Sequence, residues 1–263
     1  MLYKAFTEKN IIITGASSGI GEELVRQLIP SNPQILAVDF NLVGLEQLQS
    51  EFPNLHILQA DLSLKSGNEQ ILAWVSAHWN SVDFCFANAG KAEFGPAEDP
   101  NWKGMDLLFQ LNVYSPIQIG MEIRERFPGA NFRLIITASA MSFWTIPGYS
   151  LYAATKSALL QWARTVWLEK NENWLTLVFP IATKTKFFEI AGRNIPKVFP
   201  IQSPSWVATT ILRGTAKGNK KIFPSALFLT MLVLNRFLRF IRWLYQLFEY
   251  QKYKKWLKKQ SEF

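Results

Sequence analysis

The amino-acid sequence predicts an α/β protein built on a doubly wound parallel β-sheet that helices cover on both faces. Six short apolar runs rich in Ile, Leu, Val and Phe alternate with segments of helical periodicity. Strands of a parallel sheet are buried on both faces, so they are expected as continuous apolar runs of this kind. With 263 residues and 49% hydrophobic composition, the chain can bury one large core. We predict one domain over 1–224 and a separate tail over 225–263.

The predicted strands cover residues 11–14, 34–39, 55–59, 82–87, 132–138 and 175–180. Ligands bind beyond the carboxyl ends of the strands in such sheets. The residues that directly follow each run are therefore the first candidates for a functional site.

The first strand leads into a glycine-rich segment, TGASSGIG at 14–21, and a helical pattern follows through Ile29. A strand, a glycine turn and a helix in this order present backbone N–H groups and a helix N-terminus to a pyrophosphate. The segment therefore predicts a dinucleotide site.

Asp39 closes the second strand, eighteen residues after Gly21. A carboxylate there would accept hydrogen bonds from the adenosine ribose and would repel a 2′-phosphate. Neither Ser18, Phe40 nor Asn41 supplies a compensating cation, so we predict NAD(H) in preference to NADP(H). The alternative is that Asp39 only caps the following helix.

Tyr152 and Lys156 are four residues apart in a helical pattern, which places both side chains on one face. At about 4 Å and an effective dielectric constant of about 20, an ammonium is worth roughly 4 kcal/mol, or about three pKa units, in favour of the phenolate. The phenol could then exchange protons near pH 7. The alternative is an ordinary amphipathic helix with a lysine that extends to solvent.

With these motifs the chain resembles the short-chain dehydrogenase/reductase family in its roughly 250-residue form, over about residues 5–225. The family's TGxxxGxG matches Thr14, Gly15, Gly19 and Gly21, and its NAG matches 88–90. Its helix asparagine matches Asn112, and its serine matches Ser139, thirteen residues before Tyr152. The resemblance implies a Rossmann-type fold and NAD(P)-dependent oxidoreductase activity.

The resemblance implies a role for each of four catalytic residues. Tyr152 would be the general acid and base, and Lys156 would lower its pKa and bind the nicotinamide ribose. Ser139 would orient the substrate carbonyl, and Asn112 would hold a water that links Lys156 to solvent. Without the family spacing, Thr137, Ser142 and Ser150 would be alternatives to Ser139, and Asn112 could simply face solvent from a helix over 101–127 that Pro116 kinks.

The resemblance also implies a set of cofactor-binding residues: Gly15, Ser17, Ser18, Gly19, Ile20, Gly21, Asp39, Asp61, Leu62, Asn88, Ala89, Gly90, Tyr152, Lys156, Pro180, Thr183 and Thr185. Asp61 could instead be a turn or cap aspartate. Ile181 replaces the family's glycine after Pro180, and Ile does not take positive φ cheaply, so the path of this loop is open.

Residues 184–204 lie where the family has its mobile substrate lid, and the segment is apolar. Its apolar residues include Phe187, Phe188, Ile190, Ile195, Val198 and Phe199. We expect a lid over a lipophilic substrate such as a steroid, a retinoid or a fatty acyl chain. The alternative is a loop packed on the core.

The basic charge of the chain lies in its tail. Lys217 and the residues after it hold eleven Lys and Arg and two Glu, whereas the first 216 residues hold 17 basic and 18 acidic side chains. This distribution argues against nucleic acid as a partner of the whole domain and favours a membrane surface as the partner of the tail.

A helical wheel over 225–250 predicts a basic amphipathic helix. Its polar side holds Asn235, Arg236, Arg239, Arg242, Gln246 and Glu249, and aromatic and aliphatic residues fill the remainder. Such a helix lies in a membrane interface, and the lysines of 252–259 add attraction to anionic headgroups. The uncharged run 222–235 has fourteen residues, fewer than the roughly 20 that span a bilayer. The alternatives are packing on another subunit and a tilted span.

Other classes of protein and location are disfavoured. The single Cys85 excludes a disulfide framework, and it is expected as a buried thiol. His56 and His78 are not placed for a Ser-His-acid hydrolase, and no Cys/His cluster offers a metal site. Charged residues interrupt any apolar N-terminal segment, so we expect a cytoplasmic protein that is peripheral on the inner face of a membrane.

The sequence therefore predicts an oxidoreductase that interconverts a secondary alcohol and a ketone on a lipophilic substrate. The alternatives are an acyl-thioester ketoreductase and a non-catalytic, membrane-attached NAD-binding sensor or scaffold. The family's usual homodimers and homotetramers pair the helices that hold Asn112 and Lys156, and the apolar residues Leu159, Leu160, Trp162 and Trp167 suit such pairing.

Overall fold

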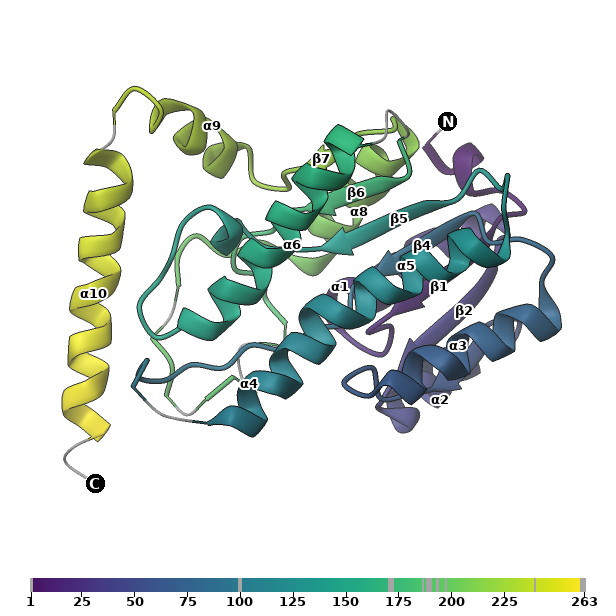
Figure 1. Ribbon diagram of the computed structural model, residues 1–263, viewed down its shortest axis with the longest axis horizontal. Coiled ribbons are helices and arrows are strands. Elements are labelled where there is room, and N and C mark those ends of the chain that lie inside the picture. Colours follow the sequence, from purple (N-terminus) through teal and green to yellow (C-terminus); the bar gives the residue numbers. More distant parts are fainter. Residues whose placement is uncertain are drawn as a thin grey trace.

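A seven-stranded parallel sheet in the order β3-β2-β1-β4-β5-β6-β7 forms the centre of the molecule. The computed structural model describes residues 2–98, 101–169, 173–185, 187, 191–192, 194–196, 198–238 and 240–260. Helices cover both faces of the sheet, and the two C-terminal helices lie to one side of it (Figure 1). The predicted doubly wound α/β fold is confirmed.

The six predicted strands are present, most with slightly shorter bounds, and a seventh follows them. The strands are β1 Asn10–Thr14, β2 Gln34–Asp39, β3 His56–Gln59, β4 Phe84–Ala87, β5 Arg133–Thr137, β6 Leu175–Val178 and β7 Lys221–Ile222. β7 pairs with β6 through Leu177–Lys221 and Val178–Ile222. A strand of two residues has no apolar run or alternation, so the sequence pattern could not reveal it.

The helices are α1 Gly19–Leu28, α2 Leu42–Glu51, α3 Lys65–His78, α4 Trp102–Phe109, α5 Ser115–Arg126, α6 Ser150–Glu169, α8 Pro204–Ala216, α9 Ala226–Leu234 and α10 Phe240–Gln260. Short 3₁₀ helices cover Leu2–Phe6, Ile29–Ser31 and Ala140–Ser142. α3, α5 and α6 pack on one face of the sheet, whereas α1, α2 and α8 pack on the other.

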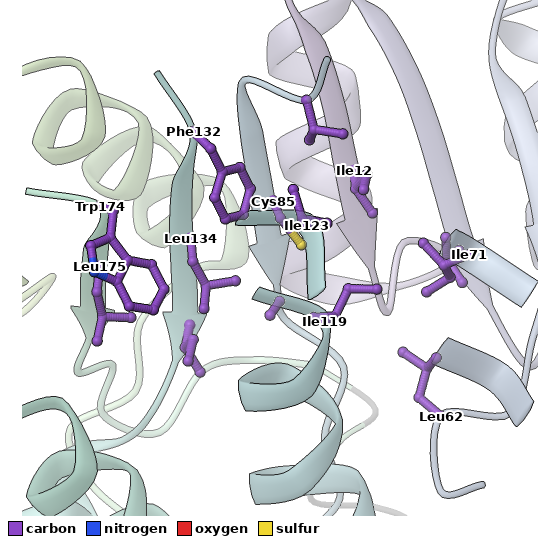
Figure 2. Close-up of a cluster of buried hydrophobic side chains, with 14 of the residues drawn as sticks. Ile12, Leu62, Ile71, Cys85, Ile119, Ile123, Phe132, Leu134, Trp174 and Leu175 are labelled. Atoms are coloured by element: carbon purple, nitrogen blue, oxygen red, sulfur yellow. The ribbon is translucent and has the colours of Figure 1, made fainter. Parts of the chain in front are cut away.

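The alternation of side chains along each strand separates two hydrophobic cores. On β1, Ile12 enters the core with α3, α5 and α6, whereas Ile11 and Ile13 enter the core with α1 and α8. Figure 2 shows the first of these cores, with Cys85 between Leu134 and Ile12. Cys85 is fully buried, as predicted, and burial raises the pKa of its thiol to about 12.

Two of the residues named for subunit pairing lie inside this core. Leu159 and Leu160 are buried among residues of their own chain. Trp162 packs edge-on against Trp174, and Trp167 Nε1 donates a hydrogen bond to the carbonyl of Leu175. These four residues therefore pack within their own chain, and the pairing of subunits stays a prediction.

The predicted helix over 101–127 is divided by a π-helical turn, Gln110–Tyr114, between α4 and α5. The N–H of Ser115 bonds to the carbonyl of Gln110, five residues earlier. Pro116 follows in the first turn of α5, where its missing N–H is tolerated. The predicted helix is therefore interrupted around Asn112, and the π-helical turn is the cause of the interruption.

The prediction of one amphipathic helix over 225–250 is wrong, because the structure has two helices, α9 and α10, with a bend between them. Ser225 begins α9 by accepting a hydrogen bond from the N–H of Phe228. Glu249, assigned to the exposed polar side, is only 3% exposed. Arg239 lies outside the described residues. None of the described helices combines the length and the apolar character that crossing a bilayer requires.

Candidate active site

The glycine turn between β1 and α1 has the close packing that a dinucleotide site needs. Gly15 and Gly19 have φ of +65° and +60°, which residues with a Cβ rarely adopt. A Cβ on Gly15 would lie 2.9 Å from the Cα of Ala89, and one on Gly21 would collide with the carbonyl oxygen of Gly15. Ser18 precedes α1 without a side-chain capping hydrogen bond, so the first N–H groups of α1 are available to an anion.

Hydrogen bonds join this turn to the ends of two other strands. Thr14 Oγ1 accepts from the backbone N–H of Asn88 and of Ala89, at 3.1 and 3.0 Å. The Asn88 side chain donates to the carbonyl of Gly15 and accepts from Thr137 Oγ1. The carboxyl ends of β1, β4 and β5 are therefore fixed relative to one another.

Asp39 is buried and holds two neighbouring loops. Its carboxylate accepts from the N–H of Ser17 and the N–H of Asn41, each at 3.0 Å. α2 is capped by Asn41, whose side chain accepts from Gly44, so the interpretation of Asp39 as the helix cap is wrong. A carboxylate has about four acceptor positions, so Asp39 can still accept hydrogen bonds from a ligand.

Asp61 fits both of its interpretations. Its Oδ1 accepts from the N–H and the hydroxyl of Ser63, which makes it a turn aspartate. Asp61 and the buried Leu62 also line the cavity described below.

The four proposed catalytic side chains are all buried at the same end of the sheet. Tyr152 and Lys156 lie one turn apart on α6, with Lys156 Nζ 5.6 Å from the centroid of the Tyr152 ring. Lys156 Nζ donates to the carbonyl of Thr137 at 2.8 Å. Ser139 lies just beyond β5, where its Oγ accepts from the N–H of Met141.

Burial, more than charge, sets the protonation of this pair. Burial raises the pKa of Tyr152 to about 12, and a hydrogen bond with Ser139 opposes the rise. Burial also lowers the pKa of Lys156 to about 7. The expected lowering of the Tyr152 pKa by Lys156 is therefore not present in this structure. At pH 7 the tyrosine is a neutral phenol and can donate a proton.

Asn112 is buried, so the solvent-facing alternative is wrong. Its Oδ1 accepts from the N–H of Lys91, and its Nδ2 donates to the carbonyl of Lys91 and to Thr155 Oγ1. A Cβ on Gly90 would lie 3.1 Å from Asn112 Oδ1 and 3.6 Å from Lys156 Nζ. Asn112 thus fixes the backbone that follows the NAG segment, close to the amine of Lys156.

The loop after β6 accommodates Ile181 without strain. Among the described residues, Glu8, Asn32 and Asn194 are the residues other than glycine with positive φ, so Ile181 has an ordinary backbone conformation. The carbonyl of Pro180 accepts from the N–H of Ala140, which attaches this loop to the segment after Ser139. Thr183 is buried, and a Cβ on Gly19 would lie 2.8 Å from the methyl group of Thr185.

Nearly all the predicted site residues line one cavity of about 580 Å³. At one end it is lined by Asp39, Asn41 and Asp61, and it passes the glycine turn to reach Ser139 and Tyr152. Gly21 lies behind the turn and Asn112 behind Gly90, so these two act through packing and hydrogen bonds.

Part of the predicted lid reaches this cavity. Phe187, Val198 and Phe199 line it, and Ile195 packs on the cluster around Tyr152. Phe188 and Ile190 lie outside the described residues.

Sequence reasoning missed a second group of lining residues. Trp144, Leu227, Phe228, Met231 and Tyr245 also line the cavity, and four of them belong to α9 and α10. No motif contains them, because apolar residues in an amphipathic segment look alike whether they face lipid or a cavity.

Curated relatives are 28% identical to this chain over part or most of its length. A yeast NADPH-dependent 1-acyldihydroxyacetone phosphate reductase (Saccharomyces cerevisiae) is 28% identical over 62% of this chain and 56% of its own length. An Escherichia coli NADP-dependent 3-hydroxy acid dehydrogenase, YdfG, is 28% identical over 58% of this chain and 63% of its own length. Both matches thus cover less than two thirds of the relative. The uncharacterized Escherichia coli oxidoreductase YbbO is 28% identical over 81% of this chain and 80% of its own.

Solved structures share the architecture at lower identity. A short-chain dehydrogenase from Sphingobium yanoikuyae in complex with NADPH has a TM-score of 0.75 and 22% identity, covering 83% of this chain and 88% of that one. A short-chain dehydrogenase/reductase from Burkholderia phymatum in complex with NAD has a TM-score of 0.76 and 16% identity, covering 88% and 94%. These likenesses concern the fold alone.

The family model for short chain dehydrogenases matches residues 9–192, more than two thirds of the chain. That range contains the glycine turn, Asn112, Ser139, Tyr152 and Lys156. The chain therefore belongs to the short-chain dehydrogenase family.

Proposed function

We propose that the protein is an NAD-dependent oxidoreductase that interconverts a ketone and a secondary alcohol on a lipophilic substrate. The observation that carries the proposal is a cavity in which Ser139 and Tyr152 adjoin a glycine turn at one side and apolar side chains at the other. A phenol that is neutral at pH 7 is suited to protonate a carbonyl oxygen as it gains negative charge.

The residues fit a nicotinamide dinucleotide. The glycine turn and the N-terminus of α1 would receive its pyrophosphate, Asp39 its adenosine ribose, and Thr183 and Thr185 its carboxamide. When bound in its reduced form, the cofactor supplies the hydride that adds to the carbonyl carbon.

The side chains of the chain itself would manage the proton. Ser139 would donate a hydrogen bond to the substrate carbonyl, and Tyr152 would transfer its hydroxyl proton to the same oxygen. The phenolate left on Tyr152 is costly in a buried site, and a protonated Lys156 would stabilise it. In the reverse direction the phenolate would accept the proton of the alcohol.

Apolar residues around the reacting groups support a lipophilic substrate. The residues packed around Tyr152 include Met141, Ile146, Phe187 and Val198. Charged side chains are rare among the described residues that line the part of the cavity next to Tyr152. The yeast relative is named for a substrate that carries an acyl group, which is consistent with the proposal.

A substrate panel tests the proposed function. We expect the ratio kcat/KM with NADH to be at least about tenfold higher for 2-dodecanone and for steroid ketones than for acetone, because each buried methylene adds about 0.8 kcal/mol. Initial rates of NADH oxidation measure this. A preference for acetone or another small polar ketone would contradict the lipophilic substrate, and no turnover with any carbonyl compound would favour the non-catalytic alternative.

Asp39 is expected to make NADH bind at least about tenfold more tightly than NADPH, since a buried carboxylate repels a 2′-phosphate. The only Lys and Arg among the described cavity-lining residues are Lys91 and Lys156, which lie next to Gly90, where the proposal would place the nicotinamide and not the adenosine ribose. The substitution Asp39→Ser should reverse the preference, as measured by fluorescence titration with each cofactor. Asp61→Asn is the control and should change both affinities alike. Tighter binding of NADPH to the unsubstituted protein would refute the assignment.

We further propose that the outer side of the tail binds the inner face of a membrane. Large apolar side chains are exposed there, among them Phe237, Phe240, Trp243 and Phe248. Lys252 Nζ lies 4.5 Å from the centroid of the Phe248 ring, and Lys258 and Lys259 lie in the last turn of α10. Aromatic side chains next to cations match an anionic lipid surface, which the cytoplasmic leaflet presents.

Binding to vesicles tests this surface. The double substitution Trp243→Ala and Phe248→Ala removes rings that are 60% and 59% exposed, and should weaken sedimentation with vesicles containing about 30% anionic lipid by at least about tenfold. Trp102→Ala, which removes an 83% exposed ring on α4, should leave it unchanged. Equal binding of all three proteins would contradict a membrane surface. Loss of an oligomer in the double variant without lipid would assign the face to a second copy.

A further inference from the structure

Both tail helices contact the same side chain next to the catalytic serine. Trp144 is buried and lies five residues after Ser139. Its ring centroid is 5.5 Å from that of Phe228 on α9, edge-on, and 5.8 Å from that of Tyr245 on α10. The tail is thereby attached to the segment that carries Ser139.

α10 makes further contacts with the body of the protein along one side. Gln246 Nε2 donates to Thr145 Oγ1 at 2.8 Å, and the ring of Trp256 lies edge-on to Phe94, at 4.9 Å. Glu249 lies between these contacts and is almost fully buried. Positions 245, 249 and 256 recur at helical spacing, so one face of α10 packs against the body of the protein along three turns.

The same two helices contribute to the cavity that contains the reacting groups. Leu227, Phe228 and Met231 from α9 and Tyr245 from α10 line it together with Ser139 and Tyr152. None of these four tail residues carries a charge at pH 7, although the tail as a whole is strongly basic. The side of these two helices that lines the cavity, called the inner side below, is therefore apolar, whereas the exposed rings lie elsewhere on the two helices.

We propose that α9 and α10 form the far wall of the substrate pocket and that Met231 and Tyr245 determine how long a substrate it accepts. The substrate is an elongated molecule whose carbonyl lies at Ser139 and Tyr152 and whose apolar end lies against the tail. This inference rests on the proposed function, because it assumes that a ketone or alcohol occupies the site. It assigns the inner side of the tail to specificity, as distinct from the lipid binding proposed for its outer side.

A thiol placed in the wall would report whether a ligand reaches it. Cys85 is the single cysteine of the chain and is fully buried, so a thiol introduced by Met231→Cys would be the one that N-ethylmaleimide labels in the folded protein. We expect 2-dodecanone with NAD⁺, a pair that cannot react, to slow this labelling at least fivefold, whereas 2-butanone with NAD⁺ should not. In the control Trp243→Cys, on the outer side of α10, neither ketone should change the rate.

Changing the volume of the wall should change the preferred chain length. Met231→Trp would shorten the pocket, so kcat/KM should fall at least tenfold for 2-dodecanone and stay within twofold for 2-butanone. Met231→Ala and Tyr245→Ala would lengthen it and should shift the optimum of a 2-alkanone series toward longer chains, because each further buried methylene adds about fourfold. Leu244→Ala, an exposed residue on α10, is the matched control and should leave the profile unchanged.

The two experiments separate this inference from the proposed function. Turnover of 2-alkanones with no protection of the thiol and an unchanged profile would overturn the inference and leave the function standing. Protection of the thiol by 2-dodecanone without turnover would support the wall and refute the reaction. If Met231→Trp does not fold, the alanine variants and the labelling still decide, and an absence of protection, of shift and of turnover overturns both.

Discussion

The substitution Tyr152→Phe is expected to lower kcat by about 10²- to 10⁴-fold, the usual contribution of a positioned acid or base. The phenol is buried and neutral at pH 7, so its hydroxyl is the proton donor that the reduced oxygen would meet. Removing one oxygen leaves the glycine turn and Asp39 untouched, so the dissociation constant of NADH should stay within about twofold. Single-turnover kinetics and a fluorescence titration measure the two quantities.

Tyr149 provides the matched control for this experiment. It lies three residues earlier, it is equally buried, and its ring centroid is 6.2 Å from that of Tyr152. Tyr149→Phe removes the same atom from the same cluster and should leave kcat within about threefold. Retained turnover in Tyr152→Phe, or an equal loss in both variants, would refute the role of Tyr152.

The substitution Lys156→Met should abolish most activity and yet stabilise the fold. Burial lowers the pKa of Lys156 from 10.5 to about 7, so at pH 7 and below the folded state bears a charged or partly charged amine that water would hold better. A shift of this size corresponds to about 4 to 5 kcal/mol, and the lost hydrogen bond to Thr137 is worth about 1 kcal/mol. We expect the free energy of unfolding at pH 7 to rise by about 2 to 4 kcal/mol, while kcat falls about 10²-fold or more.

The direction in which the free energy of unfolding changes with pH tests whether the buried amine of Lys156 is the cause of the stabilisation. Between pH 7 and pH 10.5 the unfolded chain binds more protons at Lys156 than the folded chain, so this residue makes stability rise with pH over that interval. Urea unfolding of both proteins at pH 7, 8 and 9 should therefore show the advantage of Lys156→Met shrinking by about 1 kcal/mol per pH unit. Lys65→Met, at a largely exposed lysine, is the control and should change neither stability nor rate. A variant that is less stable at pH 7, or an advantage independent of pH, would contradict this account.

Motif spacing was sufficient to predict which residues come together at the carboxyl ends of the strands. Strands of a parallel sheet end at one edge, so residues after β1, β2, β4 and β5 had to meet there, and a four-residue spacing on α6 had to align Tyr152 with Lys156. The protonation of this pair could not be predicted in the same way. Spacing gives the distance between two charges, but the burial that raises one pKa and lowers the other depends on residues distant in sequence.

In the tail, the sequence pattern was not sufficient to predict the structure. A helical wheel assumes one unbroken helix surrounded by one solvent, and here the helix is broken and faces two environments. Glu249 counts as polar in the wheel, yet it is buried where α10 packs against the body of the protein. Contacts with Trp144 and Phe94, about 100 and 160 residues away in sequence, decide which side of α10 faces inward, and no local pattern records them.

The π-helical turn at Gln110–Tyr114 has a consequence for how this gene can change. Such a turn holds one residue more than an α-helix would, so losing a single codon there would convert α4 and α5 into one regular helix. α4 and α5 would keep their faces, because the turn itself accommodates the extra residue, but the side chains within the turn would return to regular helical positions. Asn112 would then leave Lys91, and natural variants should therefore tolerate substitutions in this turn more readily than length changes.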